Sequence, residues 1–257
     1  MEVLSLVVDD DAWKDVTDEQ IERSRRYFSG MAKLAWSHSC SILMGCPKWP
    51  TSETSSASGV FLKVRGRHFL ATAFHVIEGF DEMRKMRGHV HFQVGELELC
   101  PFHSLAYHNK SDDLAIMEIQ PWQVQEVGST PFVAEPNWPP PSPLRGQLVQ
   151  FCGYARINRK DGEAGLIDST VLPLVGVVSA SSESHFAIRI EREKYRWDGD
   201  CLLPPNESFL GGMSGGPAML LTKTDANLVG IVSEGSEAFD IVRFTPLSRV
   251  PWLEITT

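Results

Sequence analysis

The chain has 257 residues and a formal net charge of −9, with 24 Lys and Arg against 33 Asp and Glu. A chain of this length can bury most of its apolar surface, in one large domain or in two lobes. The negative charge argues against nucleic acid or an anionic membrane as a partner. No run of about 18 apolar residues occurs, so we expect no membrane-spanning helix.

The N-terminus and the cysteines bear on the cellular compartment. Residues 1–11 lack the positive charge and the apolar core of a signal peptide. The cysteines are odd in number and show no framework spacing, so we expect mostly buried thiols in a reducing compartment, with a Cys40–Cys46 disulfide as the less favoured alternative. Together these features predict a cytoplasmic protein. The five cysteines are Cys40, Cys46, Cys100, Cys152 and Cys201.

The first predicted element is a helix over residues 17–37. A capping-box pattern over residues 17–20 opens it, and apolar residues recur on one face at helical spacing. These residues are Ile21, Phe28, Met31, Ala32 and Ala35. We interpret the helix as a packing element on the outside of the domain, with an inhibitory or partner-binding role as the alternative. The Pro, Ser and Thr content of residues 47–58 predicts a loop.

From residue 41 the sequence changes to short alternating stretches separated by turns, which is typical of an antiparallel barrel. An apolar run over residues 69–77 reads as a strand that carries His75 near its end, and another strand follows Asp112 and Asp113. His89 and His91 share a face at period two, but no third ligand accompanies them, so we expect solvent-facing histidines and no metal. The predicted strands cover residues 59–64, 67–72, 89–94, 97–100 and 114–119.

Five prolines fall between residues 136 and 143 and predict a stiff, extended linker. We therefore divide the chain into an N-terminal extension over residues 1–37, a first barrel over 38–135, a linker over 136–145 and a second barrel over 146–257. The strands of the second barrel are expected at residues 146–155, 171–180, 185–190, 217–221, 228–233 and 241–244. Residues 156–168 and 191–207 are polar and predict loops.

One serine, Ser214, stands among four glycines and shortly before Pro217. Glycines on both sides permit main-chain angles that a Cβ would forbid. They also free the N–H groups of Gly212 and Ser214 to point the same way, as the donors of an oxyanion hole do. In α/β-hydrolases a similar turn holds the nucleophile, but the histidine follows the serine, and here no histidine follows Ser214. A triad in the order His, Asp, Ser remains.

Three blocks, T-A-F-H at residues 72–75, D-L-A at 113–115 and G-M-S-G-G-P at 212–217, resemble the signature blocks of the trypsin-like serine peptidases. Residues 228–236 resemble the strand beside the nucleophile that binds substrate backbone in that family. The resemblance covers roughly residues 40 to 255. It implies an all-β fold of two antiparallel six-stranded barrels of the chymotrypsin type, to which the N-terminal helix is an addition, with the triad in the crevice between them.

The resemblance also implies a serine endopeptidase that works through an acyl-enzyme. Ser214 would be the nucleophile, His75 the base and Asp113 the residue that orients it, with the oxyanion held by Gly212 and Ser214. We choose Asp113 over Asp112 because it directly precedes Leu-Ala and because strand alternation sends its neighbour to the other face. The implied partner is a protein or peptide substrate, with no metal or organic cofactor; a regulatory partner is not identifiable. The alternatives are a catalytically silent domain that binds proteins, and an esterase.

For substrate binding, the resemblance places Ser208 at the base of the primary pocket and Ser233, Glu234 and Gly235 along one wall. No acid lies at the base, and Glu234 is expected to face solvent at the rim. An unpaired cation is costly to bury, so we predict cleavage after small or medium apolar residues. A branched side chain from residue 241 or 242 would make the pocket shallow.

Met213 stands where zymogen-type members of the family carry an aspartate that pairs with the freed N-terminus. A thioether cannot make that ion pair. We therefore expect no activation by propeptide cleavage, and a turn held instead by packing, by a partner or by substrate.

Overall fold

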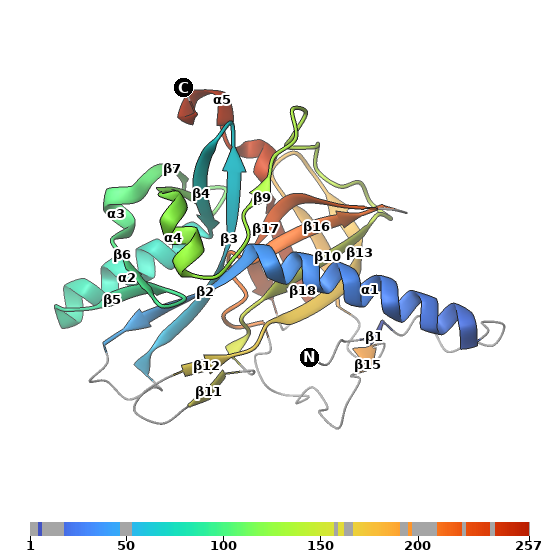
Figure 1. The fold of residues 1–257 in the computed structure, drawn as a ribbon, viewed down its shortest axis with the longest axis horizontal. Coiled ribbons are helices and arrows are strands. Elements are labelled where there is room, and N and C mark those ends of the chain that lie inside the picture. The colour runs from blue at the N-terminus through green and yellow to red at the C-terminus, as the bar shows by residue number, and fades with distance from the viewer. Residues whose placement is uncertain are drawn as a thin grey trace.

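The fold consists of a curled sheet and a closed barrel that lie side by side, with a long helix across the outside (Figure 1). This arrangement confirms the predicted all-β fold of the chymotrypsin type with an N-terminal helix. The structure, a computed structural model, describes residues 5–6, 18–46, 53–156, 159–161, 167–190, 195–196, 210–222, 225–236 and 240–256.

The first half of the chain forms an eight-stranded sheet. Its strands are β2 (Ser39–Gly45), β3 (Ser55–Val64), β4 (Arg67–Thr72), β5 (His91–Val94), β6 (Leu97–Leu99), β7 (Leu105–Asn109), β8 (Leu114–Ile119) and β9 (Phe132–Val133). They follow the order β6-β5-β2-β3-β4-β8-β7, and β9 runs parallel to β3. The predicted first barrel thus takes the form of a curled sheet in which the two end strands, β6 and β7, do not pair with each other.

The second half forms a closed barrel of six strands in the order β10-β13-β14-β18-β17-β16, as predicted. The strands are β10 (Leu148–Gly153), β13 (Leu172–Ser181), β14 (Phe186–Arg189), β16 (Pro217–Leu221), β17 (Ala226–Ser236) and β18 (Ile241–Pro246). Fully buried aromatic side chains fill the interior, and the rings of Phe186 and Phe244 stack at 4.8 Å between centroids. Met213 belongs to the same core, so the turn that carries Ser214 is anchored by apolar burial.

Short elements complete the fold. Two small pairings join β1 (Ser5–Leu6) to β15 (Tyr195–Arg196) and β11 (Arg159–Asp161) to β12 (Ile167–Ser169). The short helices are α3 (Pro101–Ser104), α4 (Pro121–Glu126), a 3₁₀ turn at Leu247–Arg249 and α5 (Trp252–Ile255). All three predicted loops are therefore partly wrong, because β3 already begins at Ser55, β11 lies inside the stretch 156–168, and β15 lies inside the stretch 191–207.

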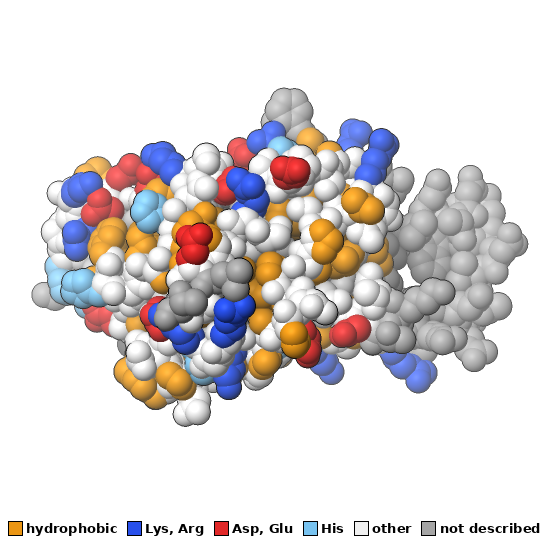
Figure 2. Space-filling model, turned by 90° about the horizontal axis from the view of Figure 1, so that it is seen from above, with side chains coloured by type: hydrophobic (Ala, Val, Ile, Leu, Met, Phe, Trp, Pro, Cys, Tyr) orange, Lys and Arg blue, Asp and Glu red, His pale blue; other side chains and the backbone are white. Residues whose placement is uncertain are grey.

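Helix α1 (Asp18–His38) lies against β10, β13 and β16 (Figure 1). Ala32 and Ala35 are buried and Met31 is half-buried, which confirms this part of the predicted apolar face. The side chains of Ile21 and Phe28 lie outside the described residues. None of the described helices is long and apolar enough to cross a membrane. On the described part of the face shown in Figure 2, acidic and basic side chains are interspersed.

The assignment of residues 69–77 to a single strand is wrong. Strand β4 ends at Thr72, Ala73 has extended angles (φ −70°, ψ 142°), and helix α2 (Phe74–Arg87) begins at the next residue. The buried side chains of Val76, Ile77 and Phe80 recur at helical spacing, a signal that the preceding apolar strand concealed. His75 therefore lies in the first turn of a helix.

The cysteines that the structure describes, Cys40, Cys46, Cys100 and Cys152, are all free thiols, and Cys201 lies outside the described residues. The disulfide considered between Cys40 and Cys46 is not formed. Burial raises the pKa of Cys152 to about 12 and raises that of Cys40 as well. These two thiols stay protonated at neutral pH and behave as small apolar side chains.

Candidate active site

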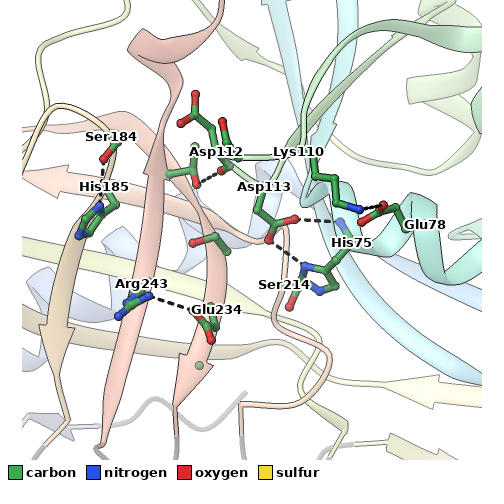
Figure 3. A pocket seen from close by; sticks show the side chains of 14 residues that line it. His75, Glu78, Lys110, Asp112, Asp113, Ser184, His185, Ser214, Glu234 and Arg243 are labelled. Carbon is green, nitrogen blue, oxygen red and sulfur yellow. Dashed lines mark hydrogen bonds and ion pairs between the residues drawn. The ribbon is translucent and has the colours of Figure 1, made fainter.

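His75 and Asp113 are brought together by the pairing of β4 with β8. These strands are antiparallel, and Thr72 at the end of β4 pairs with Ala115 near the start of β8. Asp113 Oδ2 lies 2.8 Å from His75 Nδ1, and Asp113 Oδ1 accepts the backbone N–H of His75 at 2.8 Å (Figure 3). One carboxylate thus holds both the backbone and the ring of His75.

The neighbouring aspartate points elsewhere. Asp112 is buried, and its Oδ2 accepts hydrogen bonds from Asn109 Nδ2 at 2.9 Å and Arg249 Nε at 3.1 Å. Its carbonyl accepts a hydrogen bond from the Thr245 hydroxyl. Asp113 has a positive φ of 50°, which Asp adopts more readily than most residues. The anchored Asp112 therefore holds the chain where Asp113 must turn toward His75.

Ser214 lies in the turn before β16 and borders the same cleft as His75 and Asp113 (Figure 3). Within the described residues, no hydrogen bond joins its hydroxyl to His75. The next residue, Gly215, has φ +89°, and a Cβ there would lie 2.1 Å from the carbonyl oxygen of Ser58. Only glycine fits this close approach.

In this turn, the carbonyl groups of two peptide units already accept hydrogen bonds. The N–H groups of the same two units point the opposite way. The Gly211 carbonyl accepts the Arg156 N–H at 2.6 Å, and the Met213 carbonyl accepts the Gly216 N–H at 2.9 Å. In a trans peptide the N–H points opposite to the C=O, so the amides of Gly212 and Ser214 point away from these partners. Within the described part of the chain, neither amide donates a hydrogen bond.

The cleft beside Ser214 has a volume of about 610 Å³ and two charged walls. One wall, from α2 and the turn before β8, carries an ion pair between Glu78 and Lys110 at 2.6 Å. The opposite wall, from β17 and β18, carries Glu234 and Arg243 at 3.3 Å (Figure 3). Three of these four side chains are more than half exposed, so the pairs add little stability and can rearrange around a ligand.

Three of the residues predicted to bind substrate, Ser233, Glu234 and Gly235, line this cleft, and the Glu234 side chain is 62% exposed. Ser208 lies outside the described residues. Because the base of the predicted primary pocket is therefore not described, the expectation that a branched residue from position 241 or 242 narrows this pocket stays a prediction. Val242 is fully buried inside the barrel, and Ile241 does not line the cleft.

Sequence reasoning missed Arg243, which lines the cleft. The reason is a register shift between Val232 and Glu234, after which Glu234 pairs with Arg243. A bulge of this kind changes which residues of a strand face a given side. The preference for small or medium apolar residues stays a prediction.

The protonation of His75 depends mainly on Asp113. The hydrogen bond to Asp113 raises the pKa of His75 above its usual 6.5; partial burial opposes this, and the charges of Asp113, Glu78 and Glu234 add to the increase. The imidazole side chain remains 50% exposed. A base of this kind is neutral only at a pH above its raised pKa.

We therefore expect kcat/KM for peptide hydrolysis to rise with pH and to reach its half-maximum above pH 6.5, because only neutral imidazole can accept a proton from Ser214. Replacing Glu234 with Gln removes one of the charges that raise the pKa and should move the midpoint to lower pH. The profile is measured between about pH 5 and about pH 9 on protein shown by circular dichroism to be folded. A flat profile across the range in which histidine titrates would rule out His75 as the base.

The other histidines offer no comparable arrangement. The rings of His89 and His91 lie 4.5 Å apart, and His91 Nδ1 is 2.9 Å from Glu98 Oε1. Among the residues that the structure describes, no three His, Cys, Asp or Glu side chains are grouped so as to hold a metal ion.

No family model matches the sequence, and a search of curated proteins gives no match. Solved structures with a similar fold include the thermostable serine protease AL20 from an extremophilic microorganism, 17% identical over 82% of this chain and 92% of its own, with a TM-score of 0.44. Others are the catalytically active tobacco etch virus protease (16% identity, 86% and 77% coverage, TM-score 0.44) and an inactivated protease paralogue of the scabies mite (16%, 86% and 93%, 0.48). These three neighbours are proteases, one of them inactivated, and the likeness to this chain concerns the fold alone.

Proposed function

We propose that the protein is a serine endopeptidase that hydrolyses peptide bonds through an acyl-enzyme on Ser214. The observation that carries the proposal is one cleft lined by a hydrogen-bonded His75–Asp113 pair and by a serine in a glycine-framed turn. Two amides of that turn have no partner among the described residues, which supports the proposal further. Each part has a separate chemical task in acyl transfer.

In the proposed mechanism, Ser214 Oγ attacks the scissile carbonyl carbon while His75 Nε2 accepts the hydroxyl proton. Asp113 bonds Nδ1–H, which leaves Nε2 as the basic nitrogen and stabilises the imidazolium. The amides of Gly212 and Ser214 donate hydrogen bonds to the oxyanion. His75 then protonates the leaving amine, the C–N bond breaks, and a water activated by the same histidine releases the acid product and the free serine.

The proposal requires the Ser214 hydroxyl to come within hydrogen-bond distance of His75. Catalytic hydrogen bonds often tighten only in the complex with substrate. The half-exposed imidazole and the half-buried serine both border the cleft, so a substrate that excludes water from it can order the pair. We propose that substrate binding completes this contact.

A polypeptide is the proposed substrate class, because β17 offers a strand edge at the cleft. Pairing of β17 with β16 ends at Ile231, whereas pairing with β18 continues to Ser236. Val232 is hydrogen-bonded to the glycine turn. Beyond Val232, one backbone edge of β17 therefore pairs with no other described strand. An extended peptide can add to such an edge and present a carbonyl to Ser214.

The test is labelling of the purified chain with a fluorophosphonate, which reacts only with an activated serine. We expect wild type to be labelled, Ser214→Ala not to be labelled, and the matched control Ser184→Ala, which removes another serine that lines the cleft, to be labelled like wild type. Folded wild-type protein without labelling would overturn the proposal and favour a silent binding domain. Hydrolysis of an activated ester without hydrolysis of any member of a peptide library would instead favour an esterase.

A further inference from the structure

We propose that Ser58 is a positioning residue that holds the turn around Ser214 so that the Gly212 amide faces the reacting carbonyl. This inference rests on the proposed peptidase function. Ser58 belongs to β3 of the first sheet, whereas the turn belongs to the closed barrel, and 154 residues separate Ser58 from Gly212.

Every hydrogen-bonding group of Ser58 is engaged. Its N–H donates to the Ser214 carbonyl at 2.8 Å, and its hydroxyl donates to the Gly212 carbonyl at 2.8 Å. The same hydroxyl accepts the Tyr154 N–H at 2.8 Å, and the Ser58 carbonyl accepts the Thr72 hydroxyl at 2.8 Å. Ser58 has no solvent exposure, so water cannot replace these partners.

These bonds restrict the peptide units on both sides of the Gly212 α-carbon. The unit that carries the Gly212 N–H is held by its own carbonyl, that of Gly211, which bonds Arg156 N–H at 2.6 Å. The next unit is held by Ser58 through the Gly212 carbonyl. The Gly212 amide can therefore rotate out of place only if one of these bonds breaks.

The backbone of the turn and that of its neighbours approach closely around Ser58. A Cβ on Gly153 would lie 2.9 Å from the Ser58 hydroxyl oxygen, and a Cβ on Gly212 would lie 2.5 Å from the Tyr154 carbonyl oxygen. Met213, between the two proposed oxyanion donors, is fully buried and carries no charge. A neutral hydroxyl from the other sheet therefore supplies the polar anchor that Met213 cannot.

The experiment compares Ser58→Ala and Ser58→Cys with Ser39→Ala. Cysteine keeps nearly the shape of serine but is a weak hydrogen-bond donor. Ser39 is the matched control, because it is about equally buried and its hydroxyl donates to the Trp36 carbonyl, at 2.9 Å, rather than to the turn around Ser214. We measure kcat, KM, the inhibition constant of a peptide aldehyde and the unfolding temperature. Assays are run where circular dichroism shows each variant to be folded.

For both Ser58 variants we expect kcat to fall about 10- to 100-fold, less than the 10²–10³ that follows loss of a whole oxyanion donor, with KM nearly unchanged. Aldehyde binding should weaken by a similar factor, because its hemiacetal oxygen needs the same amides. Ser39→Ala should lower the unfolding temperature and leave kcat at the wild-type value.

Normal kcat in folded Ser58→Cys would overturn the inference while leaving the proposed function intact. Equal losses of kcat in Ser39→Ala and Ser58→Ala would also overturn it, since they would show a general effect of destabilisation. Wild-type protein that neither reacts with a fluorophosphonate nor hydrolyses peptides would overturn both proposals, so the two failures are distinguishable.

Discussion

Replacing Ser214 or His75 with alanine is expected to lower kcat for a susceptible peptide by about 10⁶, and replacing both to lower it no further. Without His75 the serine hydroxyl keeps its proton, and without Ser214 the imidazole has no nucleophile to activate. The residual rate, about 10³ above that in water, would come from substrate binding and the Gly212 and Ser214 amides. The measurement is kcat for the two single variants and the double variant, each purified free of wild-type enzyme.

His185→Ala is the matched control for the histidine replacement. His185 lines the same cleft, but within the described residues its ring forms hydrogen bonds only with Ser182 and Ser184, so its loss should change kcat by no more than a few-fold. Additive effects of the Ser214 and His75 replacements would mean that the two residues do not act as a unit. A His75→Ala variant with near-normal kcat would contradict the mechanism outright.

The strand pattern of the sequence predicted much of the fold because local alternation and turn residues determine it. The limits of β4, β8 and β16 match the predicted ranges 67–72, 114–119 and 217–221. These strands carry mostly buried apolar residues, and a turn directly precedes β4 and β8. Strand β7, by contrast, was missed. It lies at the edge of its sheet with half-buried and exposed residues in alternation, a pattern that a polar loop also shows.

The site was predictable only as far as its motifs extend. The T-A-F-H and D-L-A blocks lie at the ends of two adjacent strands, so His75 and Asp113 meet wherever those strands pair. The contact between Ser58 and Gly212 has no local signal, because it depends on how the sheet docks against the barrel. Arg243 was missed for a related reason, since a bulge in β17 decides which residue of β18 stands beside Glu234.

The second large expected effect is a fall in kcat when one of the two adjacent aspartates, Asp112 and Asp113, is replaced. Asp113→Asn is expected to lower kcat by about 10⁴, because the Asn amide would donate to His75 Nδ1 and leave the proton on Nε2, the nitrogen that must act as base. Asn also accepts the positive φ of this position, so the fold should remain intact. Loss of the carboxylate removes the largest contribution to the raised pKa of His75, and the pH profile of the residual activity should shift to lower pH.

Asp112→Asn should show the opposite pattern. The Asp112 carboxylate is buried against the Arg249 side chain, which is 40% exposed, so the lost charge should lower the free energy of unfolding by about 1 kcal/mol. Activity should fall less than about tenfold, since the amide oxygen of the introduced side chain could still accept one hydrogen bond from Arg249 and the backbone bond to Thr245 is unaffected. Urea denaturation and kcat of both variants provide the comparison. A catalytic loss in Asp112→Asn that exceeds the loss in Asp113→Asn would show that His75 is oriented by the other aspartate during turnover.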